Sequence, residues 1–179
     1  CIDGAGGARV VWEQEVIAGH NCFAAHVTAN GVATVIANMW GTWGTDTREP
    51  RIIAVNNAAT NALVGCLSNE TQGYRAVELY VWTNLDAFLQ RLTPPRNVAG
   101  DRESLIIDWD GADQVFFAND VPSANVLQIG HAKIGIGPPG TQDVPYAEFH
   151  GYDLAAGRTG GILGGAALLA YAIVPPPPQ

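Results

Sequence analysis

The chain has 179 residues, enough for one domain with a sizeable core; 47% of them are hydrophobic and 15% are charged. It carries 9 Lys and Arg against 17 Asp and Glu, a net charge of −8, with Lys133 as its single lysine. This balance excludes nucleic acid and anionic membrane surfaces as partners, because both require a basic footprint.

Most of the chain is predicted to form β-strands separated by turn residues. Residues 9–17 are rich in β-formers, and residues 22–40 read as a hairpin around Asn30-Gly31, a dipeptide typical of a two-residue type I′ turn. In residues 75–83 the side chains alternate between one buried and one amphipathic face. The other predicted strands are residues 51–56, 62–67, 104–109, 114–118, 126–136, 148–152 and 162–174.

Residues 84–92 are the one predicted helix. Four apolar side chains follow the i, i+3, i+4, i+7 spacing of a helix face, namely Leu85, Phe88, Leu89 and Leu92. Asn84 is a suitable N-cap, and Pro94 prevents continuation. The sequence therefore predicts a helix of two to three turns near this position.

Many strands and one short helix exclude βαβ crossovers, so the sheets must be antiparallel. We expect an all-β fold, a two-sheet sandwich resembling a jelly roll, with a closed β-barrel as the second choice. Residues 1–174 form this single domain, and residues 175–179 form a proline-rich C-terminal arm.

Asp108, Asp110 and Asp113 lie within six residues around Gly111, between two predicted strands. Hard cations bind oxygen ligands presented by a tight turn, so these are the candidate ligands if the chain binds Ca²⁺ as a cofactor. The spacing departs from that of a calcium loop, however. A polar β-turn built on Asp110-Gly111 is the favoured interpretation.

Trp40 and Trp43 stand beside glycines at the end of a predicted strand. Exposed aromatic rings stack on sugar faces, so the pair is a candidate contact for a glycan or a protein partner. The alternative is that both rings cap the core, where tryptophan buries a large area.

Three cysteines leave the redox state open. Cys22 and Cys66 lie in separate apolar strands and are the expected pair if a disulfide forms. Cys1 would then have no disulfide partner within the chain. Three reduced thiols are the alternative. A chain beginning with Cys1 also suggests processing of a longer precursor, and hence an extracellular or particle-surface location.

The C-terminal stretch, residues 160–179, is uncharged between Gly160 and Val174 and then runs into Pro175, Pro176, Pro177 and Pro178. It is too short and too rich in glycine for a membrane-spanning helix. We expect residues 162–174 to be a strand whose apolar side chains fill the core. We expect the prolines to form an extended arm that lies across an adjacent subunit.

No catalytic motif is present, and three functions remain. The first is a structural subunit that assembles with copies of itself, as in a virion coat, a decoration protein or a surface filament. The second is a secreted glycan-binding module, with or without Ca²⁺. The third is a hydrolase whose site residues converge only in the fold.

Overall fold

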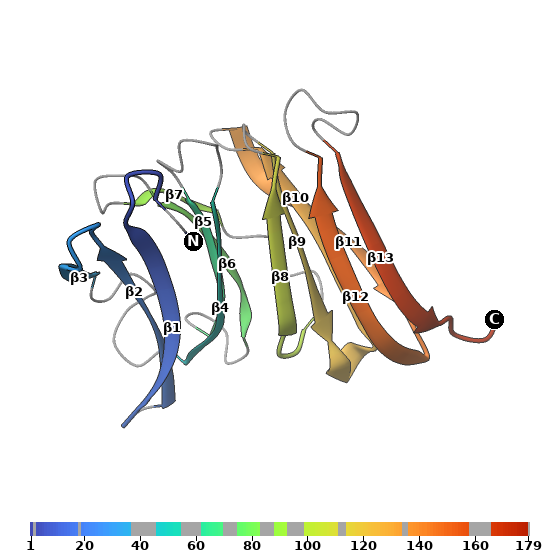
Figure 1. The fold of residues 1–179 in the computed structure, drawn as a ribbon. Coiled ribbons are helices and arrows are strands. Elements are labelled where there is room, and N and C mark those ends of the chain that lie inside the picture. Colours follow the sequence, from blue (N-terminus) through green and yellow to red (C-terminus); the bar gives the residue numbers. More distant parts are fainter. Residues whose placement is uncertain are drawn as a thin grey trace.

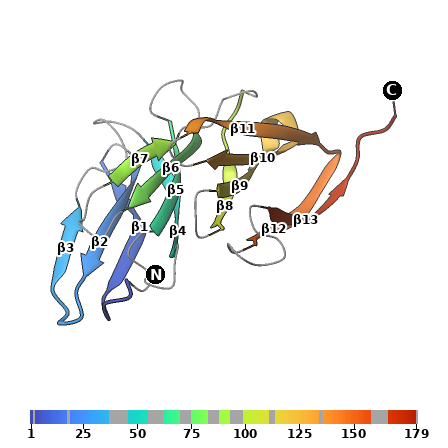
Figure 2. The ribbon, with the colours of Figure 1, turned by 90° about the horizontal axis from the view of Figure 1, so that it is seen from above.

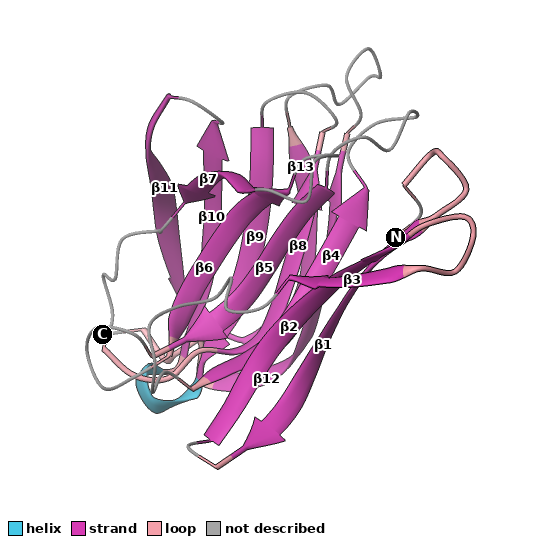
Figure 3. Ribbon diagram, turned by 90° about the vertical axis from the view of Figure 1, so that its left-hand side faces the viewer, coloured by secondary structure: helices cyan, strands magenta, loops and turns pink. Residues whose placement is uncertain are grey.

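The computed structural model describes residues 1, 3–17, 19–36, 46–54, 62–69, 75–82, 88–92, 99–110, 114–133, 136–157 and 166–178. Within these ranges the fold is all-β: every strand pairing is antiparallel, and the one helical element is a single 3₁₀ turn, Pro122–Ala124 (Figure 3). The predicted all-β antiparallel sandwich is confirmed.

The strands form four sheets, called A to D here, and each sheet is a run of consecutive strands. Sheet A contains β1 (Ala8–Val16), β2 (Gly19–Val27) and β3 (Ala33–Ile36). Sheet B contains β4 (Thr47–Ala54), β5 (Ala62–Ser68), β6 (Ala76–Trp82) and β7 (Phe88–Leu92). Sheet C contains β8 (Glu103–Trp109), β9 (Gln114–Val121), β10 (Val126–Lys133) and β11 (Ile136–Pro145). Sheet D contains β12 (Glu148–Ala156) and β13 (Ala167–Val174).

The four sheets are stacked across the molecule in chain order, and the C-terminus leaves from the far end of sheet D (Figures 1 and 2). Three clusters of buried apolar side chains fill the three spaces between them. The largest lies between sheets B and C and includes Leu63, Leu79, Leu105, Ile107 and Phe117. The molecule is therefore an open stack of four layers, and the closed barrel is excluded.

The two central strands of sheet B, β5 and β6, are buried on both faces, which the sequence analysis did not foresee. Every residue of β5 and β6 is buried. Residues 75–83 were expected to have one amphipathic face, yet Glu78, Tyr80 and Trp82 on that face are 1%, 5% and 0% exposed. Sheet A covers this face, and the opposite face packs on sheet C.

The predicted hairpin between β2 and β3 is present, but its turn is of another type. Gly31 N–H donates to the Thr28 carbonyl at 2.9 Å, and Thr28 N–H donates to the Val32 carbonyl at 2.9 Å. Gly31 has φ 77°, whereas Asn30 is not among the residues with positive φ. A type I′ turn needs positive φ at both central residues, so this is a three-residue loop closed by a glycine bulge.

The predicted helix over residues 84–92 is wrong for residues 88–92, which form β7 and pair with β6. Residues 83–87 lie outside the described ranges. A nine-residue segment with four apolar side chains fits either element, and the open edge of β6 supplies the hydrogen-bonding partner that decides for a strand.

Strand β11 was not predicted beyond its first residue, because its sequence, IGPPGTQDVP, is rich in glycine and proline. Proline is compatible with a strand only at a sheet edge, and β11 is the edge of sheet C. Among the described strands, those that pair are sequence neighbours, so each sheet is a meander without the Greek-key connections of a jelly roll.

The C-terminal strand is present as β13, but only part of it faces the core. Leu169 and Ile173 pack against the cluster between sheets C and D. Leu168 and Val174, on the opposite face, are 62% and 42% exposed. The expectation that the apolar side chains of this strand fill the core is therefore wrong for alternate residues.

Candidate functional site

The aspartates of the predicted cation site lie at the turn between β8 and β9. The Asp108 carboxylate accepts a hydrogen bond from the Ala156 N–H at 2.6 Å, and the Asp110 carboxylate accepts one from the Gln114 N–H at 3.1 Å. Asp113 lies outside the described residues. No cluster of three possible metal ligands occurs within the described ranges. This geometry favours the turn interpretation, and Asp108 also fastens β12 to sheet C.

Among the described residues, the other predicted site residues do not assemble into a site. Trp40 and Trp43 lie outside the described residues, so the predicted glycan or partner contact stays a prediction. Cys22 and Cys66 share the cluster between sheets A and B, but the predicted disulfide between them is not formed. Buried at 3% and 0% exposure, the two thiols act as small apolar core side chains.

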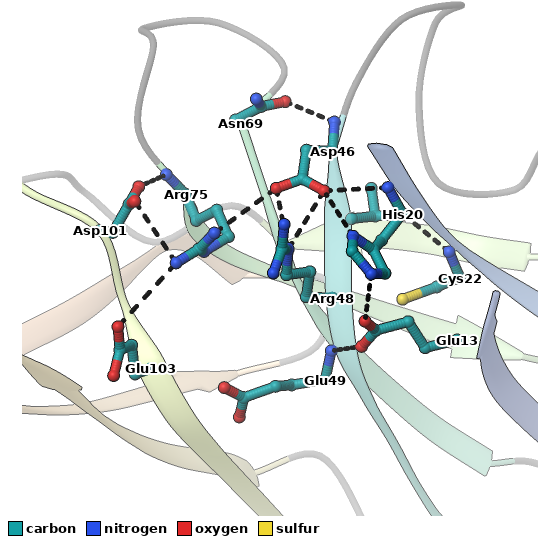
Figure 4. A network of polar contacts seen from close by, with 11 residues as sticks. Glu13, His20, Cys22, Asp46, Arg48, Glu49, Asn69, Arg75, Asp101 and Glu103 are labelled. Atoms are coloured by element: carbon teal, nitrogen blue, oxygen red, sulfur yellow. Dashed lines mark hydrogen bonds and ion pairs between the residues drawn. The ribbon is translucent and has the colours of Figure 1, made fainter. Parts of the chain in front are cut away.

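A network of charged side chains crosses the stack from sheet A through sheet B to sheet C, and the sequence analysis missed it (Figure 4). At its centre is Asp46, which directly precedes β4. Arg48 Nε donates to both carboxylate oxygens of Asp46, at 2.9 and 3.1 Å. Arg75 Nη1 donates to the same carboxylate at 3.4 Å, and the backbone N–H of His20 donates at 3.1 Å.

Burial by itself would raise the pKa of Asp46, but the hydrogen bonds from Arg48 and from the His20 N–H outweigh it. The net effect is a lowered pKa, so Asp46 is ionised at neutral pH. Arg75 extends the network to sheet C, with Nη2 at 3.3 Å from Asp101 and 4.0 Å from Glu103.

His20 lies between two carboxylates, with Nδ1 at 3.6 Å from Asp46 and Nε2 at 3.8 Å from Glu13. A histidine beside carboxylates is a common acid–base arrangement. Here, however, Asp46 is held by two arginines, and Glu13 accepts the backbone N–H of Glu49 at 2.9 Å. Both carboxylates thus hold backbone in place, and the network acts as a clamp between sheets.

Part of this network has a local signal in the sequence. Asp46 and Arg48 are two residues apart, a spacing that puts both side chains on one face of a strand. The contact with Arg75 has no such signal, because Arg75 is 29 residues from Asp46.

A second polar contact fastens the connection between β11 and β12 to sheet C. Asp120 on β9 is 6% exposed and accepts a hydrogen bond from the Tyr146 hydroxyl at 2.6 Å. Burial is the main cause of a raised pKa at Asp120, and burial together with Asp120 raises the pKa of Tyr146. Near this pair, the Tyr152 hydroxyl donates to the Ser104 carbonyl.

The outer face of β13 is the largest departure from an ordinary surface. By alternation along the strand this face carries Leu168, Ala170, Ala172 and Val174, and all four are exposed. No charged residue occurs between Ala166 and Pro178. The carboxylates of sheet D, Glu148 and Asp153, lie on β12 opposite Val174 and Ala170 and share this outer face.

The outer face of sheet A, at the other end of the stack, is also apolar. Val10 and Val35 are 44% and 55% exposed. Beside Val10, the rings of Trp12 and Phe23 are stacked with centroids 5.5 Å apart. Apolar strands thus lie at both ends of the stack, although Glu148 and Asp153 of β12 share the outer face of sheet D.

Comparisons of the chain with protein-family models, with curated proteins and with solved structures gave no match. Among the described residues, no helix has the length and apolar character needed to cross a membrane. Function is therefore inferred from the fold and its side chains alone.

Proposed function

We propose that this chain is a structural subunit that assembles with copies of itself in an extracellular particle or filament. The observation that carries the proposal is the outer face of β13, where four apolar side chains are exposed in a row without a charge. Contiguous exposed apolar surface of this kind is typical of protein interfaces.

The sequence of β13 resembles that of a strand covered on both faces. A short continuous apolar run is typical of a fully buried strand, and β13 reads ALLAYAIV. Among the described strands, the two whose residues are all buried, β5 and β6, are covered on one face by sheet A and on the other by sheet C. Sheet D has such a cover only on the side of sheet C.

A second copy supplies the missing layer most simply. Two sheets pack face to face about 10 Å apart with their strands roughly aligned, which is the arrangement already repeated within this stack. A two-fold axis between two D sheets brings the outer faces of β13 together, with Glu148 and Asp153 of β12 on the same face beside the contact.

The outer face of sheet A provides a second contact surface at the opposite end of the stack (Figure 1). A subunit with one self-complementary surface at each end extends beyond a dimer into a chain of subunits. The sparse charge of the sequence, 15% Asp, Glu, Lys and Arg, fits a surface of which part is covered by neighbours.

Sedimentation velocity over a wide range of protein concentration tests the proposal. We expect dimers and larger species, and we expect Leu168→Lys to shift them to smaller species while thermal stability is kept, because Leu168 is 62% exposed. Ile17→Lys is the matched control, since Ile17 is a fully exposed apolar residue outside the strands. A chain that stays monomeric at all concentrations, or a Leu168→Lys variant that assembles like the intact chain, would contradict the proposal.

A further inference from the structure

A cleft opens between sheets C and D, on the inner side of sheet D and beside the first residues of β13. Its volume is about 360 Å³. Its walls are mainly apolar, with Phe116 and Ile129 on sheet C and Leu154 and Leu169 on sheet D. A volume of this size between apolar walls is typical of a site for a small molecule.

Small residues on the two inner faces create the cleft. On sheet D, Ala167 lines it and is paired with Ala156, so this end of the sheet projects only methyl groups into a spacing of about 10 Å. On sheet C, Gly140 contributes no side chain, and an added Cβ there would lie 3.3 Å from the imidazole of His131. The glycine therefore gives the imidazole its place in the lining.

Two hydrogen-bond donors lie together on the sheet C wall. His131 is directly opposite Phe116 on β9 and Gly140 on β11, and Gln142 lies on the same face of β11. Both side chains line the cleft and are exposed. An imidazole presents an N–H donor in either protonation state, and an amide presents two. A ligand that fits is therefore apolar over most of its length and carries a hydrogen-bond acceptor at one end.

The charges around the cleft favour an anionic acceptor. Among the described residues that line it there is no Asp or Glu. Lys133, the single lysine of a chain with net charge −8, lies two residues beyond His131 on the same face of β10. Asp108 of β8 shares this face, but its carboxylate accepts the N–H groups of Trp109 and Ala156, at 2.8 and 2.6 Å. A carboxylate is the acceptor that matches these surroundings.

We propose that the cleft binds a medium-chain carboxylic acid, with its hydrocarbon chain between sheets C and D and its carboxylate at His131 and Gln142. At about 30 Å³ for each water-sized group, the cleft holds roughly a dozen non-hydrogen atoms, the size of an acid of about eight to ten carbons. The inference does not rest on the proposed function, because the cleft is on the inner side of sheet D and the proposed contact between copies is on its outer face.

Amide NMR of the ¹⁵N-labelled chain, titrated with octanoate, tests the site. We expect saturable shifts concentrated at residues 129–131, 140–142, 154 and 167–169. The matched probe is 1-octanol, which has the same chain length and no charge. It should bind about tenfold more weakly, because hydrogen bonds to a charged acceptor are the stronger ones. Shifts scattered elsewhere, or none, would overturn the inference, and so would equal affinity for the two probes.

Two substitutions test the two ends of the site. Ala167→Phe places a ring in the cleft and should abolish binding of both probes, whereas Ala29→Phe, at an exposed position between β2 and β3, should change neither. His131→Ala should weaken octanoate binding about tenfold and leave 1-octanol binding unchanged. His131 is exposed, so this variant tests the site even where Ala167→Phe does not fold. Octanoate binding that survives either substitution undiminished would overturn the inference.

Leu168→Lys separates the site from assembly. Leu168 lies on the outer face of β13, so this variant should bind octanoate like the intact chain. A chain that proves monomeric and still binds octanoate supports the inference while the proposed function fails. A chain that assembles through Leu168 but does not bind octanoate retains the proposed function and overturns the inference.

Discussion

Strands β6 and β13 have similar sequences and opposite surroundings. Both are apolar over nearly their whole length, AVELYVW and ALLAYAIV. Every residue of β6 is buried, whereas five of the eight residues of β13 are exposed. The difference lies in the number of neighbouring layers, since β6 lies between two sheets and β13 has one on a single face. An apolar strand with one covered face is therefore a sign of a missing layer.

Leu79→Ala and Leu168→Ala apply the same chemical change to the two strands and should give the largest contrast. Leu79 is 0% exposed in the cluster between sheets B and C, so its truncation should cost about 3 kcal/mol of unfolding free energy. Leu168 is 62% exposed, so its truncation should cost less than about 0.5 kcal/mol in dilute protein and act on assembly instead. Urea denaturation at low protein concentration measures both, and equal costs would remove the distinction.

The clamp around Asp46 provides the next contrast. It joins sheets A, B and C through charged side chains, whereas the connection that leads into sheet D is held to sheet C by the hydrogen bond between Tyr146 and Asp120. Asp46→Asn should lower the unfolding free energy by about 1–2 kcal/mol at pH 7, since hydrogen bonds to a charged group are lost. The folded-state pKa of Asp46 is lowered. Its contribution is therefore present above the unfolded value of about 3.9 and disappears as pH falls through the folded value. Urea denaturation of both proteins between pH 7 and pH 3 should show the difference shrinking on acidification, and a constant difference would contradict this assignment.

The contribution of Asp120 to stability should change with pH in the opposite direction. Its pKa is raised, mainly by burial, so its contribution to stability is present below the unfolded pKa and is lost as pH rises through the folded value. Asp120→Asn keeps an acceptor for the Tyr146 hydroxyl and removes the buried charge. At pH 7 the variant should match or exceed the intact chain by up to about 1 kcal/mol. Asp120→Leu, which removes the acceptor too, is the control expected to destabilise at every pH.

Addition of Ca²⁺ should have the smallest effect on stability among these tests. Asp108 and Asp110 already accept backbone hydrogen bonds, and Asp108 uses one to hold β12. We expect no shift of the melting temperature at millimolar Ca²⁺. A saturable increase that Asp110→Asn removes would show instead that the turn between β8 and β9 is a cation site.

The sequence predicted what depends on neighbours along the chain. Most strands and the Asn30-Gly31 hairpin follow from alternation and from turn residues, which are local signals. The number of layers does not, because Glu78 and Tyr80 look amphipathic until sheet A covers them. The clamp between Asp46 and Arg75 was likewise missed, since the two residues meet only once β4 and β6 are in one sheet.

The helix that was predicted wrongly over residues 88–92 and the strand β11 that was not predicted have the same explanation. Residues 88–92 carry part of a helical pattern but extend the edge of β6, and the prolines of β11 are tolerated because this strand is also an edge. In both cases a neighbouring strand determines the structure. The exposed face of β13 was also missed, because a continuous apolar run predicts burial and does not say whether the cover is part of the same chain.

Burial of the outer β13 face by a second copy is the central claim, and methyl NMR with a paramagnetic agent in the buffer tests it most directly. The methyl groups of Leu168 and Val174 should relax rapidly in dilute protein, like those of the exposed Ile17. At high protein concentration they should become protected and approach the behaviour of the buried Leu79, while Ile17 stays accessible. Methyl groups of Leu168 and Val174 that remain as accessible as those of Ile17 at every concentration would contradict the account.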